Sequence, residues 1–542
     1  MTTQLVIIAA ICMLCVVAGK FTNKIGVPAL LIFILLGIVF GSEGIFRISF
    51  DNYHFAEQIS TIALIFIMFY GGFCTNWAMA KPVAVKAGLL ASFGVVITAF
   101  LTGTFCVYVF NTGWLKGLLI GSVIASTDAA SVFSILRTKK LNLSGGSASL
   151  LEIESGSNDP TAYTMTTIIL GLMAGNDLKS IPIVLASQLI FGLAFGAAIG
   201  VLGSKLLSRY NFRENGFQSI LVVSFALLSY SLPVLLNGNG FLSVYITGII
   251  LGNSTIRSKS ELVHFFDGIT GIMQMLLFFM LGLLTFPSKM VPVIVPAIGI
   301  ALFMTFISRP IAVGLLLIPF KVSLRQQLLI CWSGLRGAAS IVFAILTVIH
   351  PAYGQDDIFH IVFFIALLSV SIQGSLLPWV SKKLNMIDDD NSILKTFNDY
   401  QQEKSINLME AHISPDHPWV GEKLSDIQLP TGMLAVMIRR DDKELVPNGD
   451  TLIKDEDTLV LTCTKFHEPS SLNLVEIEIT NRHPWVHLSL KEITLPQNLL
   501  IVMIKRKGNF ITPSGSTIIK KHDILMVCGS EPEVLLDMVD IS

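Results

Sequence analysis

Charged residues are scarce in this chain of 542 residues, and their scarcity excludes an ordinary soluble protein. Lys, Arg, Asp and Glu make up 14% of the sequence, hydrophobic residues make up 52%, and mean hydropathy is +0.69. Such values are typical of a protein with many membrane spans. Of the 37 Lys and Arg residues, 22 lie at or before Lys383 and 15 lie in the last 159 residues. We therefore predict a membrane domain over residues 1–385, a linker over 386–402, and a polar domain after it.

Several signatures of other protein classes are missing. The seven cysteines show no metal-binding spacing apart from Cys12 and Cys15, which lie in the first apolar run without a second pair. We therefore expect unpaired thiols. No G-x-G-x-x-G follows a strand after residue 385, which argues against NAD(H) binding by a Rossmann domain. The polar domain holds no nucleophile–base or metal constellation. We expect neither an enzyme nor a cofactor, and no nucleic-acid partner.

Apolar runs predict a polytopic all-α membrane protein with thirteen transmembrane helices. The N-terminus has no basic n-region and no small-x-small cleavage site, so its first run reads as a retained helix. Several runs are shorter than the roughly 20 residues that a spanning helix needs, and 240–252 is the weakest. The runs are 3–20, 27–41, 58–79, 85–111, 114–137, 147–173, 181–208, 218–235, 240–252, 263–286, 290–319, 324–349 and 357–381.

Loop charges predict the orientation of these helices. Sixteen basic residues lie on one set of connections and four on the alternate set, and such an excess marks the cytoplasmic side. We therefore expect the N-terminus outside and the C-terminal domain inside, in the cell inner membrane. The larger set is Lys20, Lys24, Lys81, Lys86, Arg137, Lys139, Lys140, Lys205, Arg209, Arg213, Arg257, Lys259, Lys321, Arg325, Lys382 and Lys383, and the smaller is Arg47, Lys116, Lys179 and Lys289.

The stretch 154–160 places two carboxylates and an amide next to an uncharged run. Its sequence is Glu-Ser-Gly-Ser-Asn-Asp-Pro. An ionisable residue at membrane depth marks an ion or proton pathway by default. Asp159 with Asn158 is the strongest candidate, because no apolar core gains from burying both. Glu154 lies five residues earlier on the helix, and we expect it to pair with Arg309 rather than to carry protons.

Two apolar runs are interrupted by polar residues, one in each half of the membrane domain. Ser126-Thr127-Asp128 interrupts 114–137, and residues 334–340 (Gly-Leu-Arg-Gly-Ala-Ala-Ser) interrupt 324–349. Paired interruptions point to a transporter site built from unwound helices, whose ends need compensating charges. Asp128 suits the N-terminal end of one half-helix, and Arg336 suits the C-terminal end of another.

Structural interpretations compete with these assignments. Single Ser, Thr or Gly residues in membrane helices usually serve packing or interhelical hydrogen bonding. An intramembrane arginine such as Arg309 is often only a structural partner. Glu152 reads as a solvated helix start near the cytoplasmic end, and His264 and Asp267 read as interfacial residues at the start of 263–286.

Together, Thr127-Asp128, the 154–160 stretch and Gly334-Leu335-Arg336-Gly337 resemble the monovalent cation:proton antiporter-1 family. Within it, the chain is most similar to the NhaP-type potassium/proton antiporters, also called cell volume regulation protein A. The match covers about residues 1–385. It implies an NhaA/NhaP-like fold of thirteen helices with two inverted six-helix repeats and two broken helices. It also implies a homodimer in which a transport domain moves against a dimerisation domain.

The resemblance also implies roles for individual residues. Asp159 is the carboxylate that alternately binds a cation and a proton, with Ser155 and the Thr127 backbone oxygen completing the K⁺ or Na⁺ coordination. Asp128 acts through water, and Arg336 supports a broken helix, while Glu154 pairs with Arg309. Asn158 beside Asp159 resembles the electroneutral branch. Many relatives have proline after Thr-Asp, and Ala129 in its place leaves the geometry of that segment open.

The polar domain contains a tandem repeat with an offset of 66 residues. His-Pro-Trp-Val at 417–420 recurs at 483–486, and Met-Ile-Arg-Arg at 437–440 recurs as Met-Ile-Lys-Arg at 503–506. A fixed offset indicates a duplicated module, here at 403–466 and 473–542. Alternating patterns predict strands at 433–439, 458–463, 499–506 and 524–528 in two α+β units packed as a pair.

Each module resembles the C-terminal subdomain of regulator-of-K⁺-conductance proteins, a TrkA-C-like unit. The resemblance implies dimerisation and a small regulatory ligand. Arg439, Arg440, Lys505 and Arg506 are candidates for facing an anionic ligand or for forming a solvated face. A tail that only aids dimerisation is the structural alternative.

We expect a proton-coupled antiporter that exports K⁺, or Na⁺, from the cytoplasm. A ligand-gated cation channel is the alternative, although no TVGYG-like filter is present. A membrane-anchored sensor would leave Asp128, Asp159 and Arg336 unexplained.

Overall fold

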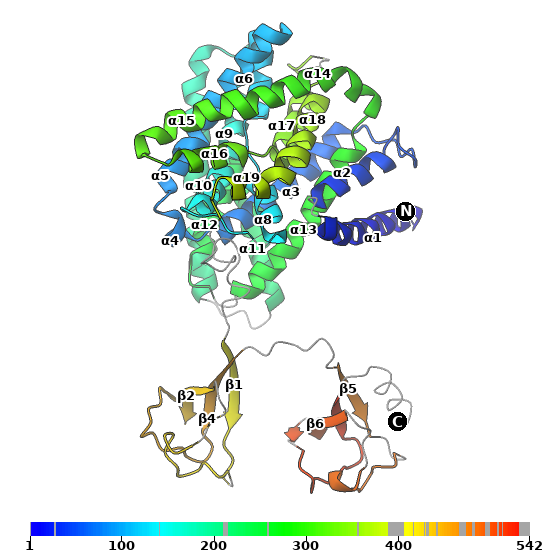
Figure 1. The fold of residues 1–542 in the computed structure, drawn as a ribbon, viewed down its shortest axis with the longest axis vertical. Coiled ribbons are helices and arrows are strands. Elements are labelled where there is room, and N and C mark those ends of the chain that lie inside the picture. Colours follow the sequence, from blue (N-terminus) through cyan, green and yellow to red (C-terminus); the bar gives the residue numbers. More distant parts are fainter. Residues whose placement is uncertain are drawn as a thin grey trace. The chain divides into compact units, whose positions relative to one another are not determined.

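The computed structural model divides into two compact units, Met1–Gln402 and Glu403–Ser542 (Figure 1). In the first unit it describes residues 2–25, 29–139, 141–209, 215–256, 259–354 and 357–387. In the second it describes 406–415, 417–427, 429, 433–440, 443–464, 473–479, 483–493, 499–506, 509–511 and 513–529.

The first unit is helical, and each of the thirteen apolar runs carries helix. Its α-helices are α1 (Thr2–Ile25), α2 (Ala29–Phe40), α3 (Tyr53–Cys74), α4 (Trp77–Ala80), α5 (Ala84–Leu89), α6 (Val95–Phe110), α7 (Trp114–Val123), α8 (Ala129–Thr138), α9 (Ser147–Met173), α10 (Ile181–Arg209), α11 (Asn215–Leu235), α12 (Gly240–Gly252), α13 (Lys259–Leu283), α14 (Pro287–Phe303), α15 (Arg309–Leu317), α16 (Leu324–Trp332), α17 (Ala338–Ile349), α18 (Ile358–Leu368) and α19 (Ser375–Lys383).

Seven continuous helical segments in the described part of the chain are long and apolar enough to cross a bilayer. They are Tyr53–Cys74, Ala84–Phe110, Leu178–Arg209, Gly216–Leu235, Lys259–Leu283, Pro287–Phe320 and Ile358–Lys383. Shorter apolar helices include α2, α7, α12 and α17. These findings confirm a polytopic helical membrane unit.

Three of the long helices contain a π-helical turn. These turns are η1 (Leu90–Gly94), η3 (Met304–Ser308) and η5 (Ser369–Gly374), each joining two α-helical pieces. A π-turn inserts an extra residue per turn and is found mostly at functional sites. Two of them, η3 and η5, lie beside the second interrupted run, as described below.

Glycines allow α12 to pack closely against α3. A Cβ atom built on Gly248 would lie 2.4 Å from the Phe69 carbonyl oxygen, and one on Gly252 would lie 2.0 Å from that of Phe73. Only glycine permits backbones to approach this closely, which is how membrane helices pack without a hydrophobic driving force. This packing holds the short helix α12 in the interior of the unit.

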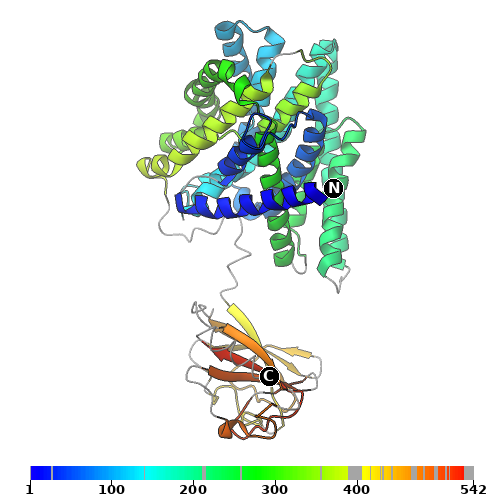
Figure 2. The same ribbon diagram turned by 90° about the vertical axis from the view of Figure 1, so that its right-hand side faces the viewer.

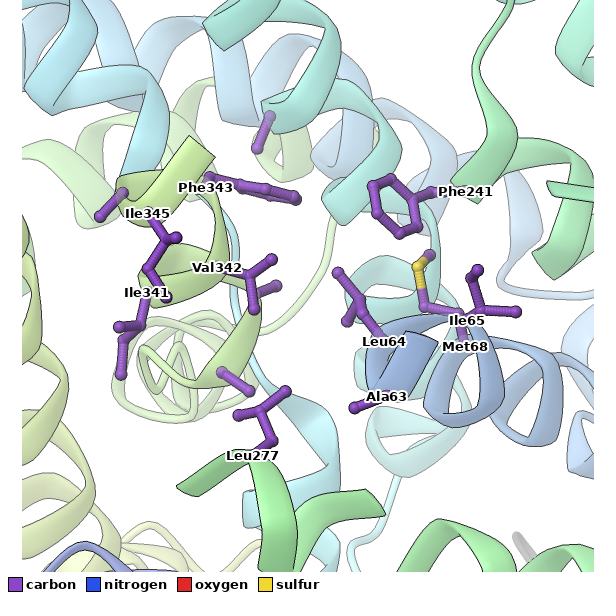
Figure 3. Close-up of a cluster of buried hydrophobic side chains, with 14 of the residues drawn as sticks. Ala63, Leu64, Ile65, Met68, Phe241, Leu277, Ile341, Val342, Phe343 and Ile345 are labelled. Atoms are coloured by element: carbon purple, nitrogen blue, oxygen red, sulfur yellow. The ribbon is translucent and has the colours of Figure 1, made fainter. Parts of the chain in front are cut away.

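A cluster of buried apolar side chains joins α3, α12, α13 and α17 (Figure 3). Its members include Ala63, Leu64, Ile65, Met68, Phe241, Leu277, Ile341, Val342, Phe343 and Ile345. The cluster fixes the start of α17, which follows the second interruption, against α3. The ribbon in Figure 2 shows these helices crossing at different angles within one bundle.

The second unit contains two four-stranded antiparallel sheets with the same strand order. The first sheet is ordered β1 (Ile406–His412), β4 (Thr458–Thr464), β2 (Leu434–Arg440), β3 (Lys443–Leu445), and the second β5 (Asn473–Glu478), β8 (Ile524–Gly529), β6 (Leu499–Arg506), β7 (Asn509–Ile511). Register shifts fall between Ala435 and Met437 in one sheet and between Ile501 and Met503 in the other. The register shifts of the two sheets are therefore also 66 residues apart, like the repeated sequence motifs.

The four strands predicted for the tail are confirmed, and four more accompany them. The α component is less evident, because the one helical segment in the described part of the tail is a 3₁₀ turn, Leu490–Glu492. Whether the two sheets pack as a pair stays a prediction.

An arginine–aspartate pair repeats at the same place in each sheet. Arg440 donates from Nε to Asp457 Oδ1 at 2.7 Å, and Arg506 donates likewise to Asp523 at 2.8 Å. Both carboxylates are fully buried. Desolvation by itself raises the pKa of a buried carboxyl, but hydrogen bonds from the arginine and from a backbone N–H hold the pKa of Asp457 and of Asp523 below its ordinary value.

These pairs correct one of our interpretations of the basic residues. Arg440 and Arg506 also donate to the Leu452 and Ile518 carbonyl oxygens, so both guanidinium groups are engaged inside their own module. They are structural groups rather than a free surface for an anionic ligand. Arg439 forms a longer, exposed contact with Glu410 at 3.6 Å.

Candidate functional site

Two interrupted helices meet at the centre of the membrane unit. Residues 125–128 between α7 and α8, and 334–337 between α16 and α17, have no regular secondary structure. The Asp128 backbone N–H donates to the Leu335 carbonyl oxygen at 2.8 Å, so the two segments are in direct contact. Backbone groups freed from helical hydrogen bonds at membrane depth require such partners.

Arg336 compensates the C-terminal end of α7. Its Nη1 donates to the carbonyl oxygens of Ala125 and Ser126, both at 2.7 Å, and its side chain is buried. These carbonyls lie just beyond the end of α7, where the helix dipole is negative. The structure therefore places this arginine at a helix C-terminus, although the helix is α7 rather than its own.

Asp128 lies at the N-terminal ends of two half-helices. It precedes α8, and its carboxylate accepts hydrogen bonds from the Ser131 backbone N–H at 3.2 Å and hydroxyl at 2.6 Å. A Cβ on Gly337, the residue before α17, would lie 2.0 Å from Asp128 Oδ2. The carboxylate therefore sits between the positive ends of α8 and α17.

Side chains of α9 hold the first interrupted segment. The Ser155 hydroxyl donates to the Thr127 carbonyl oxygen at 2.7 Å, and the Asn158 amide donates to Thr127 Oγ1 at 2.5 Å. The Ser126 hydroxyl forms a short hydrogen bond with Asp159 Oδ1. Helix α9 thus presents Ser155, Asn158 and Asp159 to one stretch of backbone.

Oxygen atoms of several kinds gather beside Asp159. The Ser155 hydroxyl donates to the Thr127 carbonyl oxygen, and the Ser126 hydroxyl donates to the Asp159 carboxylate. Among the described residues, no basic side chain forms an ion pair with Asp159. Hydroxyl, carbonyl and carboxylate oxygens are the ligands that hard cations prefer. The donor set therefore fits a cation or a proton as cargo.

Asn158 has a different position from the other candidates. Its side chain is fully buried, and it does not line the cavity beside Asp159. It contacts Thr127 and lies 3.5 Å from the Ser126 hydroxyl. In this structure it therefore holds the interrupted segment, and its role in ion binding stays a prediction.

A cavity of about 490 Å³ opens beside Asp159. One wall contains Thr127, Asp128, Ser155 and Asp159, and the other comes from α3, α12 and α13. The cavity contains the space in which a cation can exchange its hydration shell for protein oxygens.

Glu154 and Arg309 form a buried ion pair. The Glu154 Oε1 and Arg309 Nη2 atoms are 2.5 Å apart, and the side chains are 1% and 4% exposed. Arg309 begins α15 directly after the η3 turn, so the pair ties α9 to this helix. The structure brings together the two residues that we expected to pair, and Glu154 does not line the cavity.

One of our placements is wrong. Glu152 is buried and lines the cavity, instead of being a solvated helix start. Asp267 is exposed, and it also lines the cavity and accepts a hydrogen bond from the Tyr70 hydroxyl at 3.1 Å. Helix α13 begins at Lys259, so Asp267 lies two turns into the helix.

The sequence reasoning missed three cavity residues that share a helix face with Asp267, namely Thr270, Gly271 and Gln274. Asp267, Thr270, Gly271 and Gln274 face the cavity from α13, at positions i, i+3, i+4 and i+7. Residues at this spacing lie on one face of a helix, and this pattern of polar and small residues was the signal in the sequence that could have predicted a cavity wall. The Thr270 hydroxyl has no hydrogen-bond partner among the described residues. Ser126 was visible as part of the interruption, but only the fold shows its contact with Asp159.

Known proteins share this architecture. A family model described as "Sodium/hydrogen exchanger, transmembrane" matches residues 6–383, more than half of the chain. The chain belongs to the sodium/hydrogen exchanger family. It is therefore a membrane-embedded cation/proton antiporter, and the assignment favours exchange over the ligand-gated channel.

Individual relatives agree with this family. The chain is 35% identical over 451 residues to the "K(+)/H(+) antiporter NhaP2" of Shewanella sp. (strain ANA-3), covering 82% of this chain and 78% of that protein. It is 31% identical over 464 residues to the "K(+)/H(+) antiporter NhaP" of Alkalimonas amylolytica, covering 85% and 81%. The resemblance to NhaP-type antiporters is confirmed.

A solved exchanger has the same fold. The sodium proton antiporter MjNhaP1 from Methanocaldococcus jannaschii at pH 8 superposes with a TM-score of 0.62 at 23% identity, covering 71% of this chain and 99% of that one. In the tail, the TrkA-C domain model matches twice, at residues 408–466 and 474–536. The tandem TrkA-C modules attached to this exchanger are thereby confirmed.

Proposed function

We propose that this exchanger exports K⁺ from the cytoplasm in exchange for external H⁺, with Asp159 as the group that binds both in turn. The observation that carries the proposal is a carboxylate that forms no ion pair with a basic side chain in the described part of the chain, in contact with Ser126 and beside a cavity. A carboxylate at this depth is costly as a bare charge, so it holds either a proton or a cation. Competition for one site couples the two fluxes.

The remaining site residues complete the ion site and hold its helices in position. Ser155 and the Thr127 carbonyl supply neutral oxygens, and Asp128 orders water at the ends of α8 and α17. Arg336 and the Glu154–Arg309 pair hold the interrupted helices in place. Because Asp159 is the single exchanging carboxylate and Asn158 beside it carries no charge, one H⁺ replaces one K⁺ and exchange is electroneutral.

Potassium is favoured over sodium as the cargo. Relatives at 31–35% identity over most of the chain are named K⁺/H⁺ antiporters, and the attached modules resemble regulators of K⁺ conductance. The oxygen ligands themselves suit either ion. Na⁺ is therefore a secondary cargo in this proposal.

The membrane arrangement follows from the thirteen apolar runs and the loop charges. All thirteen cross the inner membrane as two inverted repeats, with two crossings broken at residues 124–128 and 333–337. The N-terminus is outside and residues 403–542 are cytoplasmic, divided into modules 403–466 and 473–542 after a linker at 386–402. Two copies form a homodimer.

The tail regulates exchange by binding a small cytosolic ligand. TrkA-C domains are matched twice, and each contains an internal Arg–Asp pair at the same place in its sheet. Truncation after residue 402 removes the regulation and leaves the exchange. If truncation changes neither the pH dependence nor any ligand response, the tail is purely structural.

Exchange in everted vesicles tests the central proposal. Vesicles containing the protein should dissipate a proton gradient on addition of K⁺, with weaker responses to Na⁺, and apparent K⁺ affinity should rise with pH because protons compete. Asp159→Asn should abolish exchange. Asp51→Asn, an exposed aspartate outside the site, is the matched control and should exchange normally. Exchange that persists in Asp159→Asn, or single-channel currents that the Asp159→Asn substitution does not change, would contradict the antiporter mechanism proposed here.

A further inference from the structure

A second cavity, of about 280 Å³, lies beside the second interrupted segment. It shares no lining residue with the cavity at Asp159. Its walls come from α14, η3, the end of α16, residues Gly334 and Arg336, and α18 with η5. Both π-helical turns that flank this region therefore line one pocket.

The mouth of this pocket faces the bilayer at mid-depth. Leu302 and Phe306 are 53% and 62% exposed, and Ile372 is 53% exposed. Leu302 and Phe306 are the sixteenth and twentieth of the 34 residues in Pro287–Phe320, and Ile372 is the fifteenth of the 26 in Ile358–Lys383. Exposed apolar side chains halfway along membrane-spanning segments contact lipid hydrocarbon.

This position determines which occupant fits. Phospholipid headgroups lie about 15 Å from the bilayer midplane, half of the roughly 30 Å hydrocarbon thickness, so they do not reach the mouth. Acyl tails do reach it. Apart from Thr305, Arg309, Arg336, Ser369 and Gln373, the lining is largely aliphatic and aromatic, which suits a hydrocarbon chain.

A chain of hydrogen bonds connects the pocket wall with the second interrupted segment. Gln373 Nε2 donates to Thr305 Oγ1 at 3.0 Å, and the Ser369 hydroxyl donates to Gln373 Oε1 at 2.5 Å. The Arg336 backbone N–H donates to the Ser369 hydroxyl at 3.0 Å. The side chains of η3 and η5 thus hold Arg336 by its backbone.

The chain continues to the ion site. Arg336 Nη1 holds the Ala125 and Ser126 carbonyls, and the Ser126 hydroxyl contacts Asp159. Every contact between residues along this path is a direct hydrogen bond, and within Arg336 and Ser126 the path runs from backbone to side chain or back through covalent bonds. Contiguous networks of this kind carry energetic coupling when one element has two arrangements, and a π-turn next to α-helix offers such a second arrangement.

We propose that the pocket binds the acyl tail of a bilayer phospholipid, and that its occupancy tunes exchange by setting the position of Arg336. A tail that fills the pocket supports its walls in the arrangement in which Gln373 of η5 bonds Thr305 of η3. Without it, the walls close and Arg336 shifts together with the Ala125 and Ser126 carbonyls. The tuning rests on the proposed exchange function, but the binding site does not.

Photolabelling tests the binding site without any transport measurement. Phospholipids with a diazirine near the tail end should label wild-type protein in the segments 298–306 and 365–373. Ala301→Phe fills the pocket, so labelling there should fall at least about fivefold, since the added ring takes the space of the chain. Val295→Phe on the same helix, 75% exposed and outside the pocket, is the control and should label like wild type.

Exchange in proteoliposomes tests the tuning. For wild type and for Val295→Phe, the exchange rate in lipids with long saturated tails should differ by roughly 2- to 30-fold from the rate in lipids with short or branched tails. The exchange rate of Ala301→Phe should be the same in both kinds of lipid. Equal labelling of wild type and Ala301→Phe overturns the site, as does a cross-link to a second copy at these segments. If Ala301→Phe fails to fold, Ile372→Trp blocks the mouth from η5 and must give the same loss of labelling. If wild-type protein is labelled but its exchange rate does not depend on the lipid, the tuning is overturned. If wild-type protein shows no exchange at all, the proposed exchange function is refuted.

Discussion

The membrane unit and the tail treat buried carboxylates in opposite ways. In the tail, Asp457 and Asp523 are fully buried, and each is held by an arginine. In the membrane unit Glu154 is held likewise by Arg309, but Asp159 has a serine hydroxyl instead and borders a cavity. Paired carboxylates have their charge compensated permanently. The carboxylate without a basic partner is the one that can accept a mobile cation or proton.

The comparison separates structural from exchanging carboxylates within a single helix. Glu154 and Asp159 are one and a half turns apart on α9, in the same low-dielectric surroundings. What distinguishes them is the residue that each meets: Arg309 at the start of α15 for Glu154, and Ser126 in the interrupted segment for Asp159. A buried charge with a fixed counter-charge is stable but inert, whereas one without it depends on its cargo.

Removing one partner of the membrane pair should have the largest effect on stability. Glu154→Gln leaves Arg309 buried without its counter-charge, which costs about 3–5 kcal/mol. Thermal unfolding in detergent should show a clearly lowered Tm, whereas Asp159→Asn should unfold at or above the wild-type Tm, because no partner is orphaned. Equal losses in the two variants would break the comparison. The double variant Glu154→Gln/Arg309→Met should recover much of the loss.

The tail pairs should show a smaller, duplicated effect. Asp457→Asn should destabilise the first module by about 2–3 kcal/mol, below the range for a fully buried pair because Arg440 is 26% exposed. Asp523→Asn should do the same in the second module. Proteolysis of the full-length protein in increasing urea measures both. Asp450→Asn, which removes an exposed contact with Lys423, is the control and should change stability little.

Acid should weaken both modules of the tail. The pKa of Asp457 and of Asp523 is lowered in the folded modules, so their contribution is complete above the unfolded value of about 3.9. It is lost as pH falls through the lower folded pKa. The urea midpoint of the modules should therefore drop as the pH falls below about 4. Asp457→Asn and Asp523→Asn should lose most of this dependence; an unchanged slope would contradict it.

Asp267 should have the smallest effect, on cation affinity alone. It lies in the cavity wall on α13 and contacts Tyr70 rather than Asp159. A negative charge there raises the local cation concentration. Asp267→Asn should raise the apparent KM for K⁺ by about three- to tenfold with little change in the maximal exchange rate. A complete loss of exchange would instead make Asp267 a second exchanging group.

Local sequence patterns were reliable for continuous helices. The run 147–173 coincides with α9, and 240–252 coincides with α12 despite its shortness. Helical boundaries here follow from where apolar residues give way to glycine, asparagine and charge. The tail repeat could also be predicted from the sequence, because a duplicated module repeats its turns and strands at one offset.

Patterns failed where a residue's role depends on its neighbours from other helices. Glu152, near the start of α9, looks like a solvated residue until the fold buries it in the wall of a cavity. Arg440 and Arg506 looked available until the sheets placed a buried aspartate beside each. In both cases the charge is visible in the sequence, but its surroundings are not.

By itself, the sequence determined the family, the helical membrane unit, the duplicated tail and the short list of intramembrane charges, because these follow from composition, periodicity and local motifs. Only the tertiary structure decided how those charges are distributed. It placed Asp159 against Ser126, showed the Glu154–Arg309 pair that the sequence had led us to expect, and formed one cavity beside Asp159 and another beside Arg336. The physical reason is that the electrostatic role of a buried group depends on the groups within a few ångströms, and these come from helices far apart in the chain.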